Sequence, residues 1–155
     1  METLLSEYGK VLKIIQYIEH NLTLIIRYKV VLNLFDENDI VPTDVFEETD
    51  ELAIEISEKF YNKTLGNLVS YIKDYNFLNN FELETLEYIL NKRNYFVHHY
   101  FKENDFEKHY DNYDFIDNQT RRLKNLLTRA DNFNYKLCEI IDKLKIEYGA
   151  IEDVA

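Results

Sequence analysis

The residues best able to do chemistry gather in one ten-residue stretch, KRNYFVHHYF, at positions 92–101. Arg93 and Asn94 are adjacent there, and His98 follows one helical turn after Asn94. A histidine titrates near neutral pH, so His98 could serve as a general acid or base. Arg93 could hold an anionic group and stabilise developing charge with its fixed fork of donors. The stretch is therefore either a reactive site or a packed helix end that carries polar residues.

A helical wheel of residues 82–102 places Arg93 in an unusual position. At about 100° per residue, one side of this helix collects the apolar residues Leu83, Leu86, Leu90, Val97 and Phe101, and Ile89, Phe96 and Tyr100 widen the arc. Arg93 falls inside the arc, Asn94 lies between apolar neighbours, and His98 lies at its edge. A buried guanidinium without a partner costs several kcal/mol. We therefore expect a carboxylate from another helix beside Arg93, or a face that opens into a polar cleft or a subunit interface.

Metal and cofactor chemistry find little support in the sequence. His98, His99 and Glu103 could be drawn as metal ligands, but adjacent histidines point to different faces of a helix. Asp36 and Glu47 have the end-to-end spacing of a calcium loop, yet apolar residues occupy its ligand and glycine positions. No HExxH motif or glycine-rich phosphate loop occurs, and the single cysteine cannot form an internal disulfide. We expect neither a metal nor a cofactor.

Long helices are expected to position this stretch, because the 155 residues include only 3 Gly and 1 Pro. The first 35 residues and residues 114–148 each carry apolar side chains at alternating steps of three and four, which predicts two long helices. The first stripe comprises Leu4, Tyr8, Val11, Ile15, Ile18, Leu22, Ile25 and Leu32. The second comprises Ile116, Leu123, Leu127, Ala130, Leu137, Ile141, Leu144 and Tyr148.

Shorter elements fill the middle of the chain. Residues 36–43 read as a connector, about 44–61 as a helix, KTLGNLVSYIKDY as a short helix, NFLNN as a turn, and 103–113 as a loop or broken helix. Gly149 can terminate the last helix, which leaves residues 149–155 as a flexible tail. The sequence thus predicts an all-α fold, an antiparallel bundle of about five helices in one domain over residues 1–148.

The net charge of −11 argues against a protein that simply holds nucleic-acid phosphates. The charge is uneven, because no Lys or Arg occurs between Lys29 and Lys59, whereas carboxylates crowd that segment. The candidates for docking a basic partner are Asp36, Glu37, Asp39, Glu47 and Glu48. The other interpretation of this block is a solvated loop and helix face. Bases gather later, at Lys92, Arg93, Lys102, Lys108, Arg121, Arg122, Lys124 and Arg129.

The sequence shows no targeting or membrane segment. The opening METLLSEYGK lacks a basic segment followed by an apolar run, and LTLIIRYKVVLNLF is interrupted by Arg27 and Lys29. We expect a cytoplasmic protein without a membrane partner.

Arg-Asn-x-x-x-His near a helix end, here Arg93, Asn94 and His98, resembles the hallmark of the HEPN domain superfamily. Arg93, His98 and Tyr100 also fit the narrower Arg-x4-His-x-Tyr form of HepT-type toxins. The motif covers about ten residues, and the support from the rest of the chain is architectural. The chain departs from HepT-type patterns because it has no tryptophan before the motif and carries a long acidic connector.

The resemblance implies a homodimeric, metal-independent ribonuclease, a toxin or anti-phage effector, that cuts single-stranded RNA by attack of the 2′-hydroxyl. Arg93 and His98 would be catalytic, and Asn94 would orient His98 or the phosphate. Tyr100 and Lys102 are the candidates for substrate binding or modification, since Tyr100 matches a tyrosine that a partner nucleotidyltransferase modifies.

Two other functions stay open. One is a HEPN-like bundle that does not cleave and instead binds a cognate protein through its acidic surface, as an antitoxin, immunity protein or inhibitor. The other is a plain helical dimerisation or adaptor module.

Overall fold

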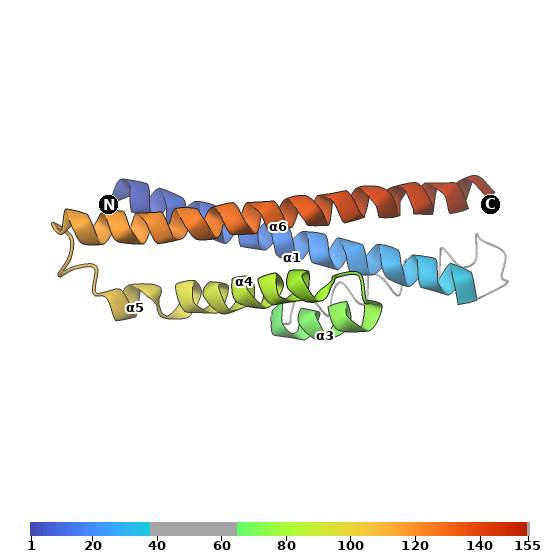
Figure 1. Cartoon of the computed structure of the whole chain (residues 1–155), viewed down its shortest axis with the longest axis horizontal. Helices are drawn as coiled ribbons and strands as arrows, with labels where there is room; N and C mark the ends of the chain where they lie inside the picture. Colours follow the sequence, from blue (N-terminus) through green and yellow to red (C-terminus); the bar gives the residue numbers. More distant parts are fainter. Residues whose placement is uncertain (38–64, 155) are drawn as a thin grey trace. The chain divides into compact units, whose positions relative to one another are not determined.

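The computed structural model describes residues 1–37 and 65–154, and every element in these ranges is a helix (Figure 1). The helices are α1 (Glu2–Glu37), α3 (Leu65–Tyr75), α4 (Asn80–His98), α5 (Tyr100–Asn104) and α6 (Tyr113–Val154). The predicted all-α fold with long first and last helices is confirmed. The helix predicted for about 44–61 and most of the predicted connector lie outside the described residues.

Helix α1 buries the stripe that its three-and-four spacing predicts. Seven of the eight predicted positions are buried: Leu4, Val11, Ile15, Ile18, Leu22, Ile25 and Leu32. The eighth, Tyr8, is half-buried because its hydroxyl reaches a backbone carbonyl of another helix. Ile14 and Ile26 join the buried stripe and widen it. The apolar period therefore sets which face of α1 is covered.

Helix α6 follows the same logic but ends later than predicted. Its buried residues include the predicted Ile116, Leu123, Ala130, Leu137, Ile141 and Leu144, together with Leu126 and Phe133. At its start the Asn112 side chain accepts the Phe115 N–H at 3.1 Å, which satisfies one free donor of the first turn. The predicted stop at Gly149 is wrong, because α6 continues through Gly149 to Val154. Gly149 does not adopt a positive φ, so nothing in its backbone breaks the helix.

The contacts divide the chain into two compact units, and both long helices contribute to each. The motif unit comprises Met1–Ile18 and Asn80–Tyr135, and the acidic unit comprises Glu19–Asn79 and Lys136–Ala155. In the motif unit 12 Asp and Glu face 10 Lys and Arg, a formal charge of −2. In the acidic unit 17 Asp and Glu face 8 Lys and Arg, a formal charge of −9. The stretch predicted as one domain thus contains two units of very different charge.

Contacts within each unit give the helix directions. In the motif unit Tyr100 binds Gln119 and Tyr88 lies against Arg129, so α4 runs antiparallel to α6 (Figure 1). In the acidic unit Asn21 Nδ2 lies 3.8 Å from Cys138 Sγ, and the Tyr28 and Tyr148 rings lie 5.7 Å apart. From the first pair to the second, the residue number rises on both helices, so α1 and α6 run parallel there. The antiparallel pair is thus α4 with α6, in the motif unit.

The predicted helix over 82–102 contains a break at its end. α4 ends at His98 and α5 begins at Tyr100, with His99 at φ −125°. The backbone bonds His99 N to Tyr95 O, 2.8 Å, and Glu103 N to His99 O, 2.9 Å, keep helical spacing across the break. Asp105 ends α5 with a backbone in the left-handed region, and turns follow it. This agrees with the loop or broken helix predicted for residues 103–113. The turn predicted at 76–80 is also found, with Asn76 at φ 50°.

Candidate functional site

The motif helix is rotated relative to the predicted wheel. Its buried residues are Thr85, Leu86, Ile89 and Phe96, and Tyr100 of α5 continues this face. Val97 and Phe101, which were expected to pack in the core, are 46% and 41% exposed. That expectation is wrong because α1 and α6 cover the side of the helix that carries Phe96 and Tyr100. The Tyr8 hydroxyl donates to the Phe96 carbonyl at 2.9 Å.

Tyr100 fixes the end of the motif helix in the core. Its side chain is 2% exposed, and its hydroxyl donates to Gln119 Oε1 at 3.0 Å. Burial, followed by Tyr95, raises the pKa of Tyr100 to about 12, although the Arg122 guanidinium acts in the opposite direction. A hydroxyl so placed is not open to an incoming nucleotide while the fold is intact. The structure therefore favours a packing role for Tyr100 over the predicted modification.

Aromatic rings surround Tyr100 and hold α5 against α1. Tyr8 stacks on Tyr100 at 5.8 Å between centroids, and it meets Phe101 edge-on at 5.0 Å. Phe106, in the turn after α5, contacts both Tyr100 and Phe101. Each such pair contributes about 0.5–1.5 kcal/mol beyond burial of area. This cluster gives the motif helix a rigid end.

The predicted catalytic residues lie on or beside an exposed face of α4. Arg93 is half-buried, and its Nη1 donates to Asn94 Oδ1 at 3.2 Å. Asn94 and His98 are both exposed and are four residues apart, so they share a side of the helix with Val97. The arrangement offers a guanidinium held by an amide, with an exposed imidazole one turn further along.

The other candidates near the motif are dispersed. His99 is exposed, and its Nδ1 lies 3.8 Å from Glu103 Oε1. The His98 and His99 ring centroids are 6.3 Å apart, and the ring planes make an angle of 68°. Lys102 is exposed on α5. Within residues 1–37 and 65–154 no three His, Cys, Asp or Glu side chains gather closely enough to hold a metal ion.

The predicted docking residues belong to the acidic unit. Asp36 and Glu37 lie in the last turn of α1. Asp39, Glu47 and Glu48 lie outside the described residues. The acidic docking surface therefore stays a prediction.

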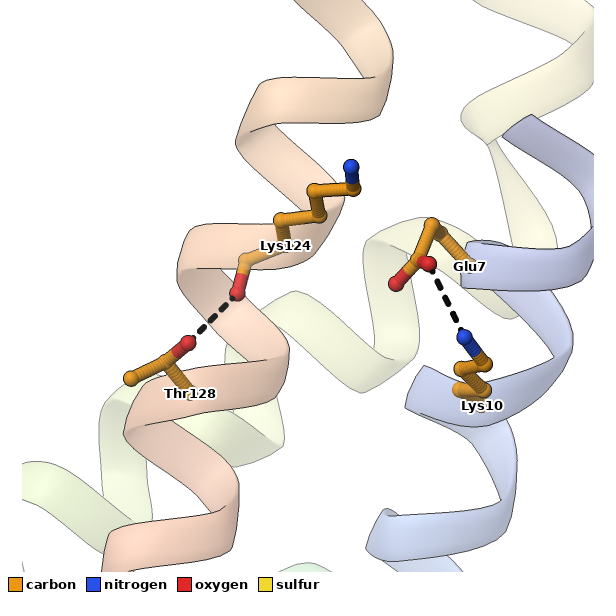
Figure 2. A network of polar contacts seen from close by, with 4 residues as sticks. All are labelled: Glu7, Lys10, Lys124 and Thr128. Atoms are coloured by element: carbon orange, nitrogen blue, oxygen red, sulfur yellow. Dashed lines mark hydrogen bonds and ion pairs between the residues drawn. The ribbon is translucent and has the colours of Figure 1, made fainter. Parts of the chain in front are cut away.

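Sequence reasoning missed the four polar residues that the fold buries, which include Thr85 and Thr120 as well as two with longer side chains. Gln119, which binds Tyr100, is one, and Glu7 of α1 is the other at 7% exposed. Glu7 forms an ion pair with Lys10 at 3.0 Å (Figure 2). Glu7 occupies the three-and-four spacing between Leu4 and Val11, so its position in the stripe was a signal of burial.

Comparisons with known proteins add no assignment. Among the described helices, none is long and apolar enough to cross a membrane. No family model, curated protein or solved structure matches the chain.

Proposed function

We propose that the protein is a metal-independent endoribonuclease of the HEPN type that cleaves single-stranded RNA, in the biological role of a toxin or an anti-phage effector. The observation that carries this proposal is the hydrogen-bonded pair Arg93–Asn94 beside the exposed His98. These residue types match the chemistry, because a phosphate needs a fixed cation and its cleavage needs a group that moves protons near neutral pH.

The proposed reaction uses no group beyond the chain and its substrate. The 2′-hydroxyl loses its proton to a histidine and attacks the adjacent phosphorus, while the bond to the 5′-oxygen breaks. A protonated histidine gives its proton to that leaving oxygen. The products are a 2′,3′-cyclic phosphate and a 5′-hydroxyl. Arg93 would stabilise the extra charge on the phosphorane oxygens, and Asn94 would hold the guanidinium in place.

A homodimer would supply both protonation states. One His98 cannot easily accept one proton and donate another in the same step, whereas two copies can divide the roles. Val97 and Phe101 lie exposed next to His98, and a second copy on this face would bury them. In this proposal each protomer contributes Arg93, Asn94 and His98 to a shared cleft.

The local charge is compatible with RNA despite the net charge of −11. Residues 88–102, which contain the motif, carry three bases and no Asp or Glu. The motif unit as a whole has a formal charge of only −2. The carboxylates that give the protein its charge belong mostly to the acidic unit.

The test is cleavage of a mixed-sequence single-stranded RNA in EDTA by the wild type, Arg93→Ala, His98→Ala and His99→Ala. We expect His98→Ala and Arg93→Ala each to lose about 10²–10⁴-fold in rate. His99→Ala is the matched control, because it removes the exposed imidazole next in sequence, which lies 3.8 Å from Glu103 Oε1. Products should carry cyclic phosphate ends by mass spectrometry. Activity that survives in His98→Ala, or that requires a divalent metal, would exclude this mechanism.

The dimer has its own test by light scattering. Val97→Asp places a charge on the exposed face beside His98, and we expect the mass to fall to that of one chain. Tyr135→Asp is the control, because Tyr135 is an exposed aromatic of α6 at 69%. A wild type that is already monomeric at micromolar concentration would remove the shared cleft from the proposal.

A second candidate function is a non-catalytic binding protein, and the charge of the acidic unit favours it. Seventeen carboxylates against eight bases would suit a basic protein partner, as for an antitoxin, immunity protein or inhibitor. A folded wild type that leaves RNA intact and binds a basic partner with strong salt dependence would support this candidate over the first.

A further inference from the structure

Two of the acid-free stretches of this protein are also rich in bases. Residues 88–102 carry Lys92, Arg93 and Lys102, and residues 118–130 carry Arg121, Arg122, Lys124 and Arg129. Together they hold 7 of the 18 Lys and Arg and none of the 29 Asp and Glu. Glu87, Glu103, Asp117 and Asp131 bound the two stretches. A surface formed by these two stretches alone would therefore be positive.

The fold brings the two stretches together in the motif unit. The Arg129 guanidinium carbon lies 3.9 Å from the centre of the Tyr88 ring, a contact between α6 and α4. Lys92 Nζ lies 5.6 Å from the same ring centre. Arg122 precedes Arg129 by seven residues on α6, and it lies close enough to Tyr100, twelve residues after Tyr88, to lower the pKa of Tyr100. The antiparallel pairing of α4 with α6 therefore aligns the acid-free segments over about two helical turns.

One surface results, which we name the α4–α6 strip. It consists of Tyr88, Lys92 and Tyr95 on α4 and Arg122, Asn125 and Arg129 on α6. The three α6 residues are exposed, and the three α4 residues are half-buried beside them. Spacings of three and four place each set on one side of its helix. The strip combines three cations, an amide and two tyrosine rings, without a carboxylate between them.

We propose that the α4–α6 strip binds the backbone and bases of single-stranded RNA next to the motif. This inference rests on the proposed function, for which it names the surface that holds the substrate. Guanidinium and ammonium groups bind phosphates, and aromatic or guanidinium planes stack on unpaired bases. The Arg129 guanidinium carbon lies 3.9 Å from the Tyr88 ring centre, and the residue is exposed, so the guanidinium is also available to an unpaired base.

The strip adjoins the reactive residue. Tyr95 and His98 are three residues apart on α4, which places them about 60° apart around the helix axis. A strand lying along Arg122 and Lys92 could thus continue over Tyr95 to the imidazole of His98. The strip would supply affinity, while Arg93 and His98 would supply chemistry.

The opposite side of α6 provides a contrast within the same acid-free stretch. Lys124 extends toward the side where Glu7 and Lys10 of α1 lie, and Thr128 Oγ1 donates to its carbonyl at 3.0 Å (Figure 2). Around the axis of α6, Lys124 lies about 160° from Arg122 and about 140° from Arg129, so it is not part of the strip. Lys124 is therefore a control of equal charge for Arg122 and Arg129.

The experiment measures binding apart from cleavage. A fluorescent single-stranded RNA with 2′-O-methyl groups, which removes the attacking hydroxyl, is titrated with the wild type, Arg122→Ala/Arg129→Ala and Lys124→Ala at several salt concentrations. Loss of two phosphate contacts should lower the slope of log K against log salt by about 1.4 and weaken binding by about tenfold at low salt. Lys124→Ala should change affinity by no more than about twofold. Arg129→Lys, which keeps the charge, separates stacking from charge, and circular dichroism checks the fold of each variant.

The outcomes separate this inference from the proposed function. Binding that fails in Arg122→Ala/Arg129→Ala but not in Lys124→Ala supports the strip, even if natural RNA is never cut. Normal binding by folded Arg122→Ala/Arg129→Ala overturns the strip, even if His98-dependent cleavage is intact. Equal losses in all three variants would show non-specific attraction and would also overturn it. So would a wild type that binds polyglutamate as tightly as RNA.

Discussion

The motif unit and the acidic unit are built on the same two long helices, yet they differ strongly in formal charge and in aromatic content. Both bury leucine and isoleucine at three-and-four spacing along α1 and α6. The motif unit holds 14 of the 23 Tyr and Phe residues and is close to neutral, whereas the acidic unit carries −9. The comparison teaches that helices with the same buried pattern can carry very different exposed residues.

The two units also differ in how their aromatic residues are used. Around Tyr100 in the motif unit, rings from α1, α4, α5 and the following turn contact one another. In the acidic unit Tyr28 of α1 and Tyr148 of α6 form a single edge-on pair. We attribute the ring cluster to the need to hold the end of the motif helix, where His98 precedes a break.

The substitutions with the largest expected effect on stability test whether the two units unfold separately. Leu123 and Leu137 are both fully buried on α6, one in each unit. Replacing either with alanine should cost about 2–5 kcal/mol of unfolding free energy, because a cavity is left. Hydrogen exchange measured by mass spectrometry should rise mostly in the unit that carries the substitution. A uniform rise across both units would show that they unfold as one.

The next effect concerns the Tyr100–Gln119 hydrogen bond. Tyr100→Phe keeps the ring but leaves the buried Gln119 oxygen without this donor, so we expect a cost of about 1–3 kcal/mol. Tyr28→Phe in the acidic unit is the matched control, because its contact with Tyr148 is made through the ring. Urea unfolding followed by circular dichroism measures both. Similar costs for the two variants would remove the distinction between the units.

The raised pKa of Tyr100 predicts a loss of stability in alkali. Its folded pKa of about 12 lies above the ordinary value of 10.0, mainly because burial penalises the phenolate. The stabilisation is fully present below pH 10 and is lost as pH rises from 10 to 12. Burial of Tyr8 raises its pKa in the same sense. Unfolding free energies at pH 9 and 11.5 should therefore differ less in Tyr100→Phe than in the wild type, and an equal difference would contradict the assignment.

The smallest effect is the contact between Arg129 and Tyr88. Arg129→Ala should cost about 0.5–1 kcal/mol, since the cation lies over the ring at an exposed site. Lys124→Ala on the other side of α6 should cost less in the same urea assay. If the two costs match, the guanidinium contributes charge alone, and its stacking role in the strip loses its basis.

Much of this fold follows from the spacing of the apolar residues alone. The stripes of α1 and α6 were predictable because three-and-four spacing leaves one solution for which face is covered. The end of α6 was not, because Gly149 can stop a helix but does not have to. The rotation of α4 also escaped prediction. Its wheel is apolar over a broad arc, so only contacts with Tyr8 and Gln119 decide that Phe96 and Tyr100 are covered while Val97 is exposed.

The candidate site was predictable in composition but not in placement. The sequence identifies Arg93, Asn94 and His98, and the exposed face follows from the fold. The strip has a sequence signal, two acid-free stretches, but a linear sequence does not say that they pack side by side. That knowledge needs the antiparallel contact between Tyr88 and Arg129.

The α4–α6 strip also predicts how the protein behaves on chromatography columns. With a net charge of −11, the protein should bind a positively charged resin at neutral pH, mainly through the acidic unit. Lys92, Arg122 and Arg129 share a surface free of carboxylates, so we expect immobilised heparin, a sulfated polyanion, to retain the same molecule. A protein that adheres to resins of both signs can be purified by using them in sequence, and nucleic acid carried over from the cell should elute with it unless salt is raised first.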